Sequence, residues 1–197
     1  AEAESDVQGF AARKAADAEN GLLRGIGLCY YIESILGDPS ETTKVEYTDD
    51  GRVNIYVGTQ SNGQGHETVY AQFLSDQTGI PVDMIDVIQG DSDRIKTGGG
   101  TGGSRSVTVQ NNATIHTVEA MTEAFVDFLA ADMGVPASQI SFDDERFRAD
   151  GSNLTPTMIE VAEMARDKGR DDLLVHELSL IHISEPTRRT PISYAVF

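Results

Sequence analysis

The chain of 197 residues is strongly acidic: 32 Asp and Glu residues oppose 15 Lys and Arg residues, giving a formal net charge of -17. This charge argues against a nucleic-acid-binding protein, because phosphates require a basic surface. No apolar run reaches about 18 residues, so no membrane span is predicted. The charged, alanine-rich residues 1–20 are unlike a signal peptide, and a single cysteine, Cys29, excludes an intramolecular disulfide framework. We expect a cytoplasmic protein of one or two domains.

The first part of the chain predicts a helix followed by a strand. Residues 6–20 are predicted to be helical, with Gly21 placed to end the helix, and residues 1–20 are interpreted as a linker into the main domain. Residues 24–36 alternate apolar and other side chains, which is typical of a strand. Cys29 lies among apolar neighbours in this segment and is therefore predicted to be a small core residue.

The middle of the chain predicts a hairpin, a helix and a short strand. Residues 44–48 and 52–57 are predicted to pair around the turn Asp49-Asp50-Gly51. A helix is expected to end near Gly79, and residues 84–89 are predicted to form a short buried strand.

The last third predicts a long helix, a strand and a final helix. Apolar side chains recur at helical spacing over residues 107–133, and residues 140–147 have the composition of a strand. Thr157 with Glu160 predicts a capping box at the start of the final helix, while Thr155-Pro156 offers a rival start.

Two glycine-rich stretches lie where a strand-like segment leads into a helix-like one. The first is Gly63-Gln64-Gly65, and the second ends in Thr101-Gly102-Gly103-Ser104-Arg105-Ser106. Glycines at such junctions let the backbone approach a ligand, and the N–H groups of the following helix favour anions. Two junctions in one short chain indicate one large anionic ligand held from two sides. We expect both stretches to lie at one end of a shared sheet and to face a common cleft.

The side chains in these stretches fit such a ligand. The amide of Gln64 donates and accepts hydrogen bonds, which suits a mixed polar edge. The two serines that flank Arg105 combine with helix-start N–H groups as a phosphate cradle or as simple helix caps. Arg105 either grips phosphate with two donors or pairs with a carboxylate such as Asp91 or Asp93. His66 is predicted to be a packed residue and not a ligand.

The residues in and between the two stretches resemble one family, the large subunits of molybdenum hydroxylases: xanthine dehydrogenase, aldehyde oxidase and aerobic carbon monoxide dehydrogenase. The matching runs are residues 53–68, Gly79-Ile80-Pro81, Val87-Ile88-Gln89-Gly90-Asp91-Ser92 and Thr101-Gly102-Gly103-Ser104-Arg105-Ser106. The resemblance implies an α+β molybdenum-cofactor-binding domain over residues 21–177, with a mixed sheet and packed helices. Because the family's subunits are several times longer, the chain is interpreted as an internal fragment with a partial domain.

The resemblance also implies residue roles. In the family's pattern, the glutamine at the position of Gln64 hydrogen-bonds the molybdopterin-type cofactor, and the second stretch contacts the pterin and its phosphates. The cytosine dinucleotide form of the cofactor is expected, with the metal held by the pterin and not by side chains. The expected cofactor-binding residues are Gly63, Gln64, Gly65, Thr101, Gly102, Gly103, Ser104, Arg105 and Ser106.

The implied enzyme oxidises a small substrate (an aldehyde, an N-heterocycle or CO) with oxygen derived from water. The family's catalytic glutamate and substrate loop are absent from this chain, so no catalytic residue is expected here and the isolated chain is expected to be inactive. The family's 2Fe-2S clusters and FAD are expected on an iron–sulfur small subunit and an FAD-binding medium subunit.

Two other classes of protein stay open. One is a non-catalytic glycine-loop module for nucleotides or anions, although the sequence has no phosphate-binding Gly-x-x-x-x-Gly-Lys-Ser/Thr motif. The other is an acidic structural subunit without a ligand. Neighbouring genes for iron–sulfur and flavin subunits would favour the hydroxylase.

Residues 178–197 resemble the translation of a sequencing adapter. The parts 178–188 and 192–197 match in the same reading frame, and Arg189-Thr190-Pro191 fits a short barcode between them. We interpret residues 178–197 as read-through and not native protein, exclude them from the fold prediction, and predict that they pack poorly.

Overall fold

The computed structural model describes residues 5–31 and 39–180. The chain divides into two compact units, residues 1–34 and residues 35–197, and each is described by itself. The first unit contains α2 (Phe10–Glu19), after which Gly21 adopts a left-handed conformation with φ 73°. The predicted helix and its glycine end are confirmed, and the helix begins a few residues later than expected.

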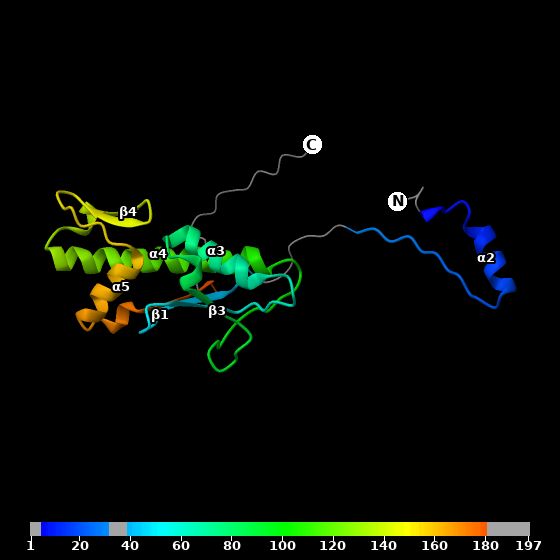
Figure 1. Ribbon diagram of the computed structural model, residues 1–197, viewed down its shortest axis with the longest axis horizontal. Helices are drawn as coiled ribbons and strands as arrows, with labels where there is room; N and C mark the ends of the chain where they lie inside the picture. Colours follow the sequence, from blue (N-terminus) through cyan, green and yellow to red (C-terminus); the bar gives the residue numbers. More distant parts are fainter. Residues whose placement is uncertain (1–4, 32–38, 181–197) are drawn as a thin grey trace, which may run out of the picture. The chain divides into compact units, whose positions relative to one another are not determined.

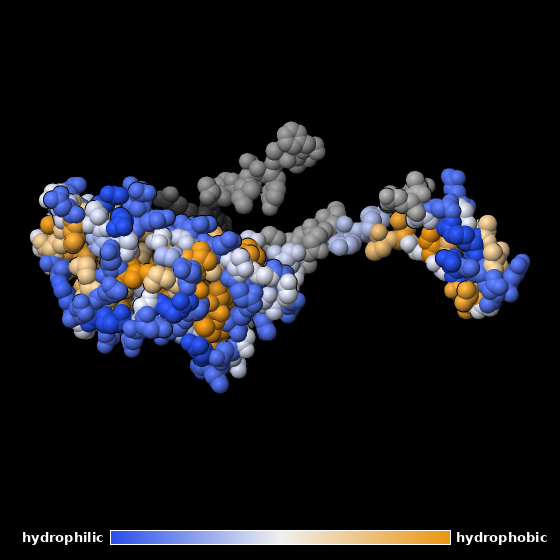
Figure 2. Space-filling view, viewed as in Figure 1, coloured by the Kyte–Doolittle hydropathy of each residue, from blue (hydrophilic) through white to orange (hydrophobic). Residues whose placement is uncertain are grey.

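The strand predicted over residues 24–36 is wrong where the structure describes it. Residues 22–31 form no regular secondary structure, and Cys29 is exposed instead of buried in a core. Figure 2 shows apolar atoms at the surface of this unit. Alternation alone does not make a strand, because the backbone also needs a neighbouring strand to bond. Residues 32–36 lie outside the described residues. The exposed large apolar residues within residues 22–31 are Leu22, Leu23, Ile26, Leu28, Tyr30 and Tyr31.

The second unit is built on a four-stranded mixed sheet, which confirms the predicted α+β fold. β1 (Thr42–Tyr47) and β2 (Val53–Val57) form the predicted antiparallel hairpin. β3 (Ile85–Ile88) is parallel to β2, and β6 (Val175–Ser179) is antiparallel to β1, so the strand order is β3-β2-β1-β6. Only the first residue of β3 is fully buried, so this strand is less buried than expected.

Two helices cover one face of this sheet. α3 (His66–Thr78) ends at Gly79 as predicted, and α4 (Ser106–Met133) matches the long predicted helix. α4 packs on β1 and β6 with one side and on β4 (Ile140–Asp143) with the other, as Figure 1 shows. Every second side chain of β1 and β2 faces the helices. Val45 and Ile55, which lie opposite each other on these two strands, are completely buried there. Among the described helices, none is long and apolar enough to cross a membrane.

The segment predicted as one strand, 140–147, is a two-stranded hairpin instead. β4 (Ile140–Asp143) pairs with β5 (Arg146–Ala149) around Asp144 and Glu145, which both adopt positive φ angles. The sequence gives little sign of this turn because it lacks the Asn-Gly or Asp-Gly pair that favours such angles.

α5 (Met158–Asp167) follows with the predicted capping box. The backbone N–H of Glu160 donates to the Thr157 hydroxyl, and the Glu160 carboxylate accepts from the Thr157 N–H at 2.7 Å. This geometry decides against the rival start at Thr155-Pro156. Short 3-10 helices complete the unit: η1 (Val82–Met84), η2 (Ala137–Gln139) and η3 (Asp171–Leu173).

The boundary assigned to the adapter-like segment falls inside the edge strand β6. Leu178 and Ser179 pair with β1, and the N–H of Leu180 donates to the carbonyl of Glu41 at 2.9 Å. Residues 181–197 lie outside the described residues. The interpretation of residues 178–197 as read-through therefore stays a prediction.

Candidate functional site

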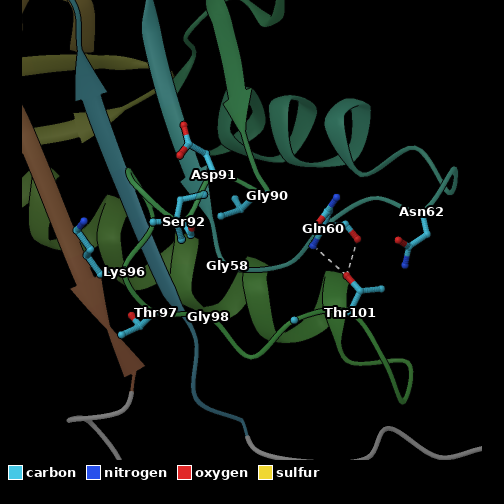
Figure 3. Close-up of a pocket in the computed structure, with 13 residues that line it drawn as sticks. Gly58, Gln60, Asn62, Gly90, Asp91, Ser92, Lys96, Thr97, Gly98 and Thr101 are labelled. Atoms are coloured by element: carbon cyan, nitrogen blue, oxygen red, sulfur yellow. Dashed lines mark hydrogen bonds between the residues drawn. The ribbon is translucent and has the colours of Figure 1, made fainter.

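The two glycine stretches meet at one edge of the sheet. β2 and β3 are parallel, so the segments that follow them leave from the same edge. We call residues 58–65 the first glycine loop and residues 97–105 the second glycine loop. Both loops contribute to one cleft with a volume of about 510 Å³, shown in Figure 3. The first loop contributes through Gly58, Gln60 and Asn62 and not through Gly63-Gln64-Gly65, so the expectation that this stretch faces the cleft stays a prediction. Its lining residues are Val57, Gly58, Gln60, Asn62, Gly90, Asp91, Ser92, Ile95, Lys96, Thr97, Gly98, Gly100 and Thr101.

The two loops touch through their backbones at Gly58 and Gly98. A Cβ atom on Gly98 would lie 2.5 Å from the Cα of Gly58, so only glycine permits this approach. The N–H of Gly100 also donates to the carbonyl of Gly58 at 3.3 Å. The floor of the cleft is therefore made by two backbones in direct contact.

Thr101 joins the loops across the cleft. Its hydroxyl oxygen accepts a hydrogen bond from the N–H of Gln60 at 3.0 Å and donates to the Gln60 carbonyl. Figure 3 shows Thr101 and Gln60 facing each other. Of the nine residues predicted to bind the cofactor, Thr101 is the one that lines the cleft.

Gln64 lies on the exposed part of the first glycine loop and is not among the lining residues. Its side-chain oxygen accepts from the N–H of Asn62. Gly63 and Gly65 have φ angles of 102° and 78°, and no atom lies within 4 Å of where a Cβ would point. The glycines beside Gln64 therefore leave open space, and the role assigned to Gln64 stays a prediction.

The second glycine loop turns sharply before α4. Gly103 and Ser104 both have φ 55°, and α4 then begins at Ser106 without a side-chain cap on its N–H groups. Gly102 has open space where a side chain would point. The helix start therefore presents N–H groups suited to an anion. The cofactor contacts predicted for these residues stay predictions.

Arg105 points into the protein. Its side chain is 7% exposed and pairs with Glu41 at 3.1 Å. The predicted pairing with a carboxylate is right in kind, but the partner is Glu41 and neither Asp91 nor Asp93. The sequence did not predict a role for Glu41, because a single glutamate between Pro39-Ser40 and a strand matches no motif.

Buried hydrogen bonds of Gln110 hold the backbone next to the cleft in place. Gln110 on α4 is fully buried, and its amide oxygen accepts from the N–H of Gly58 at 3.1 Å. Its amide nitrogen donates to the carbonyl of Thr42 at 3.0 Å and to the hydroxyl of Thr43 at 2.7 Å. Gln110 thereby fixes the end of β2 against β1. In the sequence, a polar residue among the apolar positions of the long helix was the one sign of this role.

The start of α3 is tied to the end of β3. The Gln89 side-chain oxygen accepts from the N–H of Ser61 at 2.8 Å, and its nitrogen donates to the Glu67 carboxylate. The pKa of Glu67 is lowered, chiefly because its own backbone N–H bonds the ionised carboxylate and also because Gln89 donates to it. Gln89, which lies in one of the runs that resemble the family, therefore stabilises the first glycine loop.

His66 is buried at the start of α3, as predicted. Its ring is 3% exposed and packs 5.1 Å from the Tyr70 ring. Its Nδ1 atom is buried without a hydrogen-bond partner within the described part of the chain. Tyr70 in turn hydrogen-bonds the Thr59 hydroxyl at 2.6 Å, so this pair packs beneath the first glycine loop.

Sequence reasoning missed most of the polar groups that line the cleft. Lys96 and Asp91 are its cation and its carboxylate, and Lys96 Nζ donates to the carbonyl of Asp93 at 2.8 Å. Amides and hydroxyls make up the other polar side chains. The sequence offered one sign of them: they follow a strand, and the loop after a parallel strand reaches the ligand-binding edge of a sheet.

These groups fit a molybdopterin-type cofactor. The glycines that line the cleft let a flat ligand approach the backbone closely. The amide and hydroxyl side chains can donate hydrogen bonds to the polar edge of such a ligand and accept them from it. The volume lies in the range of cofactor pockets, roughly 300–1,000 Å³. Lys96 offsets part of an anion's charge in the cleft.

Fold and cleft together define a cofactor-binding α+β domain. A Cu,Mo-CO dehydrogenase and a reconstituted CO dehydrogenase from Oligotropha carboxidovorans each have a similar structure, with a TM-score of 0.64 and 30% identity. In both cases the match covers 71% of this chain and 18% of the other. Quinoline 2-oxidoreductase from Pseudomonas putida 86 shares the fold at a TM-score of 0.52 and 22% identity, over 71% of this chain and 19% of its own.

The family model of the molybdopterin cofactor-binding domain matches residues 1–191, and the chain belongs to this family. The carbon monoxide dehydrogenase large chain of Afipia carboxidovorans is 33% identical over 66% of this chain, and that of Hydrogenophaga pseudoflava is 30% identical over 78%. The nicotine 6-hydroxylase large subunit of Paenarthrobacter nicotinovorans is 30% identical over 61%. The resemblance to molybdenum hydroxylase large subunits is confirmed, and the chain spans 16% to 21% of these relatives' lengths.

Proposed function

We propose that the chain forms part of the cofactor site of a molybdenum hydroxylase and holds a molybdopterin-type cofactor in the cleft between its two glycine loops. The observation that carries the proposal is the joining of both loops over one cleft by Thr101 and Gln60. A single ligand in this cleft would meet both loops at once.

Each part of the site has a task in this proposal. Gln64 turns from Asn62 towards the ligand and offers both a donor and an acceptor to the pterin edge. The N–H groups at the start of α4, with Ser104 and Ser106, receive phosphate, and the cytosine dinucleotide form is proposed because of the family resemblance. Lys96 adds positive charge at the cleft. Arg105 is already bonded to Glu41 and acts through the shape of the second glycine loop.

The bound cofactor supplies the oxidation of a small substrate with oxygen derived from water. This chain's residues hold and orient it, whereas the proton-transferring glutamate and the substrate loop are proposed to lie in other parts of a longer subunit. The names of the relatives include carbon monoxide and nicotine as substrates. The substrate of this protein is proposed only as a class: an aldehyde, an N-heterocycle or CO.

Partner subunits follow from the same proposal. The relatives are described as large chains or as a subunit of a complex, and we propose an iron–sulfur small subunit and an FAD-binding medium subunit here. These would carry electrons away from the cofactor. A cytoplasmic location belongs to the same proposal.

The test is Gln64→Ala in the complete enzyme, with molybdenum and pterin content measured per protein. We expect cofactor occupancy to fall because a donor and an acceptor are lost together. Cys29→Ala is the control, since Cys29 is exposed and is not among the lining residues of the cleft, and its replacement should leave occupancy and stability unchanged. Full molybdenum loading in purified Gln64→Ala enzyme would contradict the role of Gln64.

The isolated 197-residue chain should show no hydroxylase turnover and should bind the cofactor weakly. Losing two or three charge-assisted hydrogen bonds from other domains, at ~1.5–3 kcal/mol each, weakens binding by orders of magnitude. If the chain instead bound a plain nucleotide more tightly than the cofactor, the alternative of a nucleotide-binding module would be favoured.

A further inference from the structure

Glu41 is a buried carboxylate that lies outside every predicted motif. The residue stands just before β1 and its side chain is 0% exposed. One carboxylate oxygen accepts from the N–H of Gly99 at 3.1 Å and from Arg105, and the other accepts from the N–H of Thr42 at 3.1 Å. This one side chain thereby bonds the start of β1, the second glycine loop and the residue before α4.

Arg105 completes the connection from the other side. Its Nη1 atom donates to Glu41 at 3.1 Å and to the carbonyl of Gly100 at 2.9 Å. Its Nη2 atom donates to the carbonyl of Ser40 at 2.7 Å. The guanidinium therefore bonds a carboxylate and two carbonyls, and its planar fork suits this arrangement better than the ammonium of a lysine.

Two glycines make room for this pair. A Cβ on Gly99 would lie 2.2 Å from Arg105 Nη1, and a Cβ on Gly58 would lie 2.2 Å from a carboxylate oxygen of Glu41. The backbones of both glycine loops therefore lie in close contact with the Glu41–Arg105 pair. Gly58, Gly98 and Gly100, which lie next to the pair or bond to it, line the cleft.

We propose that Glu41 and Arg105 form a positioning pair that presets the second glycine loop for the cofactor, and that the Arg105 guanidinium does not contact the cofactor. This inference rests on the proposed function. Its physical basis is pre-organisation: a glycine-rich loop has many accessible conformations, and ordering it before binding removes that cost from binding. The buried charge pair holds the loop in one of them.

The experiment compares three variants of the complete enzyme: Glu41→Gln, Arg105→Lys and Asp86→Asn. Asp86→Asn is the matched control, because the Arg52–Asp86 ion pair lies near the starts of β2 and β3, at the opposite end of these strands from the cleft. Each variant is also produced in a host that makes no molybdopterin, which gives the cofactor-free protein. Hydrogen exchange of the peptide covering residues 97–105 reports the order of the loop without any cofactor.

Glu41→Gln should speed this exchange roughly tenfold or more in the cofactor-free protein, since the buried guanidinium loses its counter-charge. Arg105→Lys should give a smaller increase, because lysine keeps the charge but cannot reach all three acceptors. In enzyme made with cofactor, molybdenum content should fall in the same order. Asp86→Asn should change neither quantity. If Glu41→Gln fails to fold, Arg105→Lys still tests the link between exchange and occupancy.

Two results would overturn the positioning role. One is Arg105→Lys lowering molybdenum content without any change in exchange, which would make Arg105 a direct ligand. The other is faster exchange in Glu41→Gln with full molybdenum content. Failure of the proposed function looks different, because the unmodified enzyme would then contain no molybdenum at all while the exchange results stood unaltered.

Discussion

At the first glycine loop, Gly63 and Gly65 face open space, whereas at the start of the second glycine loop Gly98 and Gly99 are pressed against protein atoms. Around these two glycines the first loop is exposed and is held by side-chain bonds from Gln64 and Gln89, whereas its start at Gly58 lies against Glu41 and Gly98. The second is held by the buried Glu41–Arg105 pair. Glycine therefore serves two physical purposes within one site.

The difference separates two kinds of glycine that look identical in sequence. A glycine beside open space keeps room for a ligand or permits a positive φ angle, so its replacement should mainly affect binding. A glycine beside backbone keeps room for the protein itself, so its replacement should mainly affect folding. Substitutions in the two loops can break or sharpen this distinction.

The largest effect is expected for Gly98→Ala. The new methyl group would lie 2.5 Å from the Cα and the carbonyl oxygen of Gly58, and backbone atoms cannot move aside as a side chain can. We expect the free energy of unfolding to fall by about 3 kcal/mol in urea titration. Gly102→Ala is the control, with open space and an expected change within about 0.5 kcal/mol. Equal losses for both variants would break the distinction.

Gln110→Leu tests the buried support beneath the loops. Leucine has a similar size but leaves the N–H of Gly58 and the carbonyl of Thr42 without the buried amide that bonds them. We expect a loss of about 2 kcal/mol in the free energy of unfolding, measured in the same way. A neutral result would mean that its contact with Gly98 and its hydrogen bond from the N–H of Gly100 are enough to hold Gly58.

Gly65→Ala tests the first glycine loop. Its φ of 78° disfavours alanine, so we expect a loss of about 1 kcal/mol, less than for Gly98→Ala. Cofactor occupancy in the complete enzyme should fall nonetheless, because the methyl group enters the open space beside Gln64. Unchanged occupancy together with the small stability loss would assign Gly65 a purely structural role.

The smallest effect is the pH dependence of Glu67. Its folded-state pKa is lowered, so its ionised form stabilises the start of α3 above the usual glutamate pKa of about 4.3, and this contribution is lost as pH falls through the folded-state value. The protection factor of residues 61–67, which is the intrinsic exchange rate relative to the observed rate at the same pH, should fall in that acid range. Glu67→Gln should remove this fall, whereas a fall of equal size in the variant would exclude Glu67 as its source.

Helices and their ends were predictable because they depend on neighbours in sequence. The helix ends at Gly21 and Gly79 and the capping box of Thr157 with Glu160 all appear as local patterns. The hairpin of β1 and β2 was predictable for the same reason, since its turn lies between two alternating segments.

Elements that depend on distant partners were predicted poorly. Residues 24–31 of the strand predicted over 24–36 alternate like a strand, but the described structure gives them no partner strand. The hairpin of β4 and β5 was merged into one strand, because Asp144 and Glu145 give no local sign of their positive φ angles. The Glu145 side chain packs over Gly79, a contact that no local pattern contains.

The sequence by itself determined the family, the two glycine loops and their place between strands and helices, because these depend on short motifs and local periodicity. Only the tertiary structure decided that Arg105 turns inward to Glu41, that Gln110 carries the end of β2, and that Lys96 lines the cleft. Each of these rests on contacts between residues far apart in sequence. A buried polar group takes the partner that the fold brings within hydrogen-bond distance, and that distance is set by packing across the whole domain.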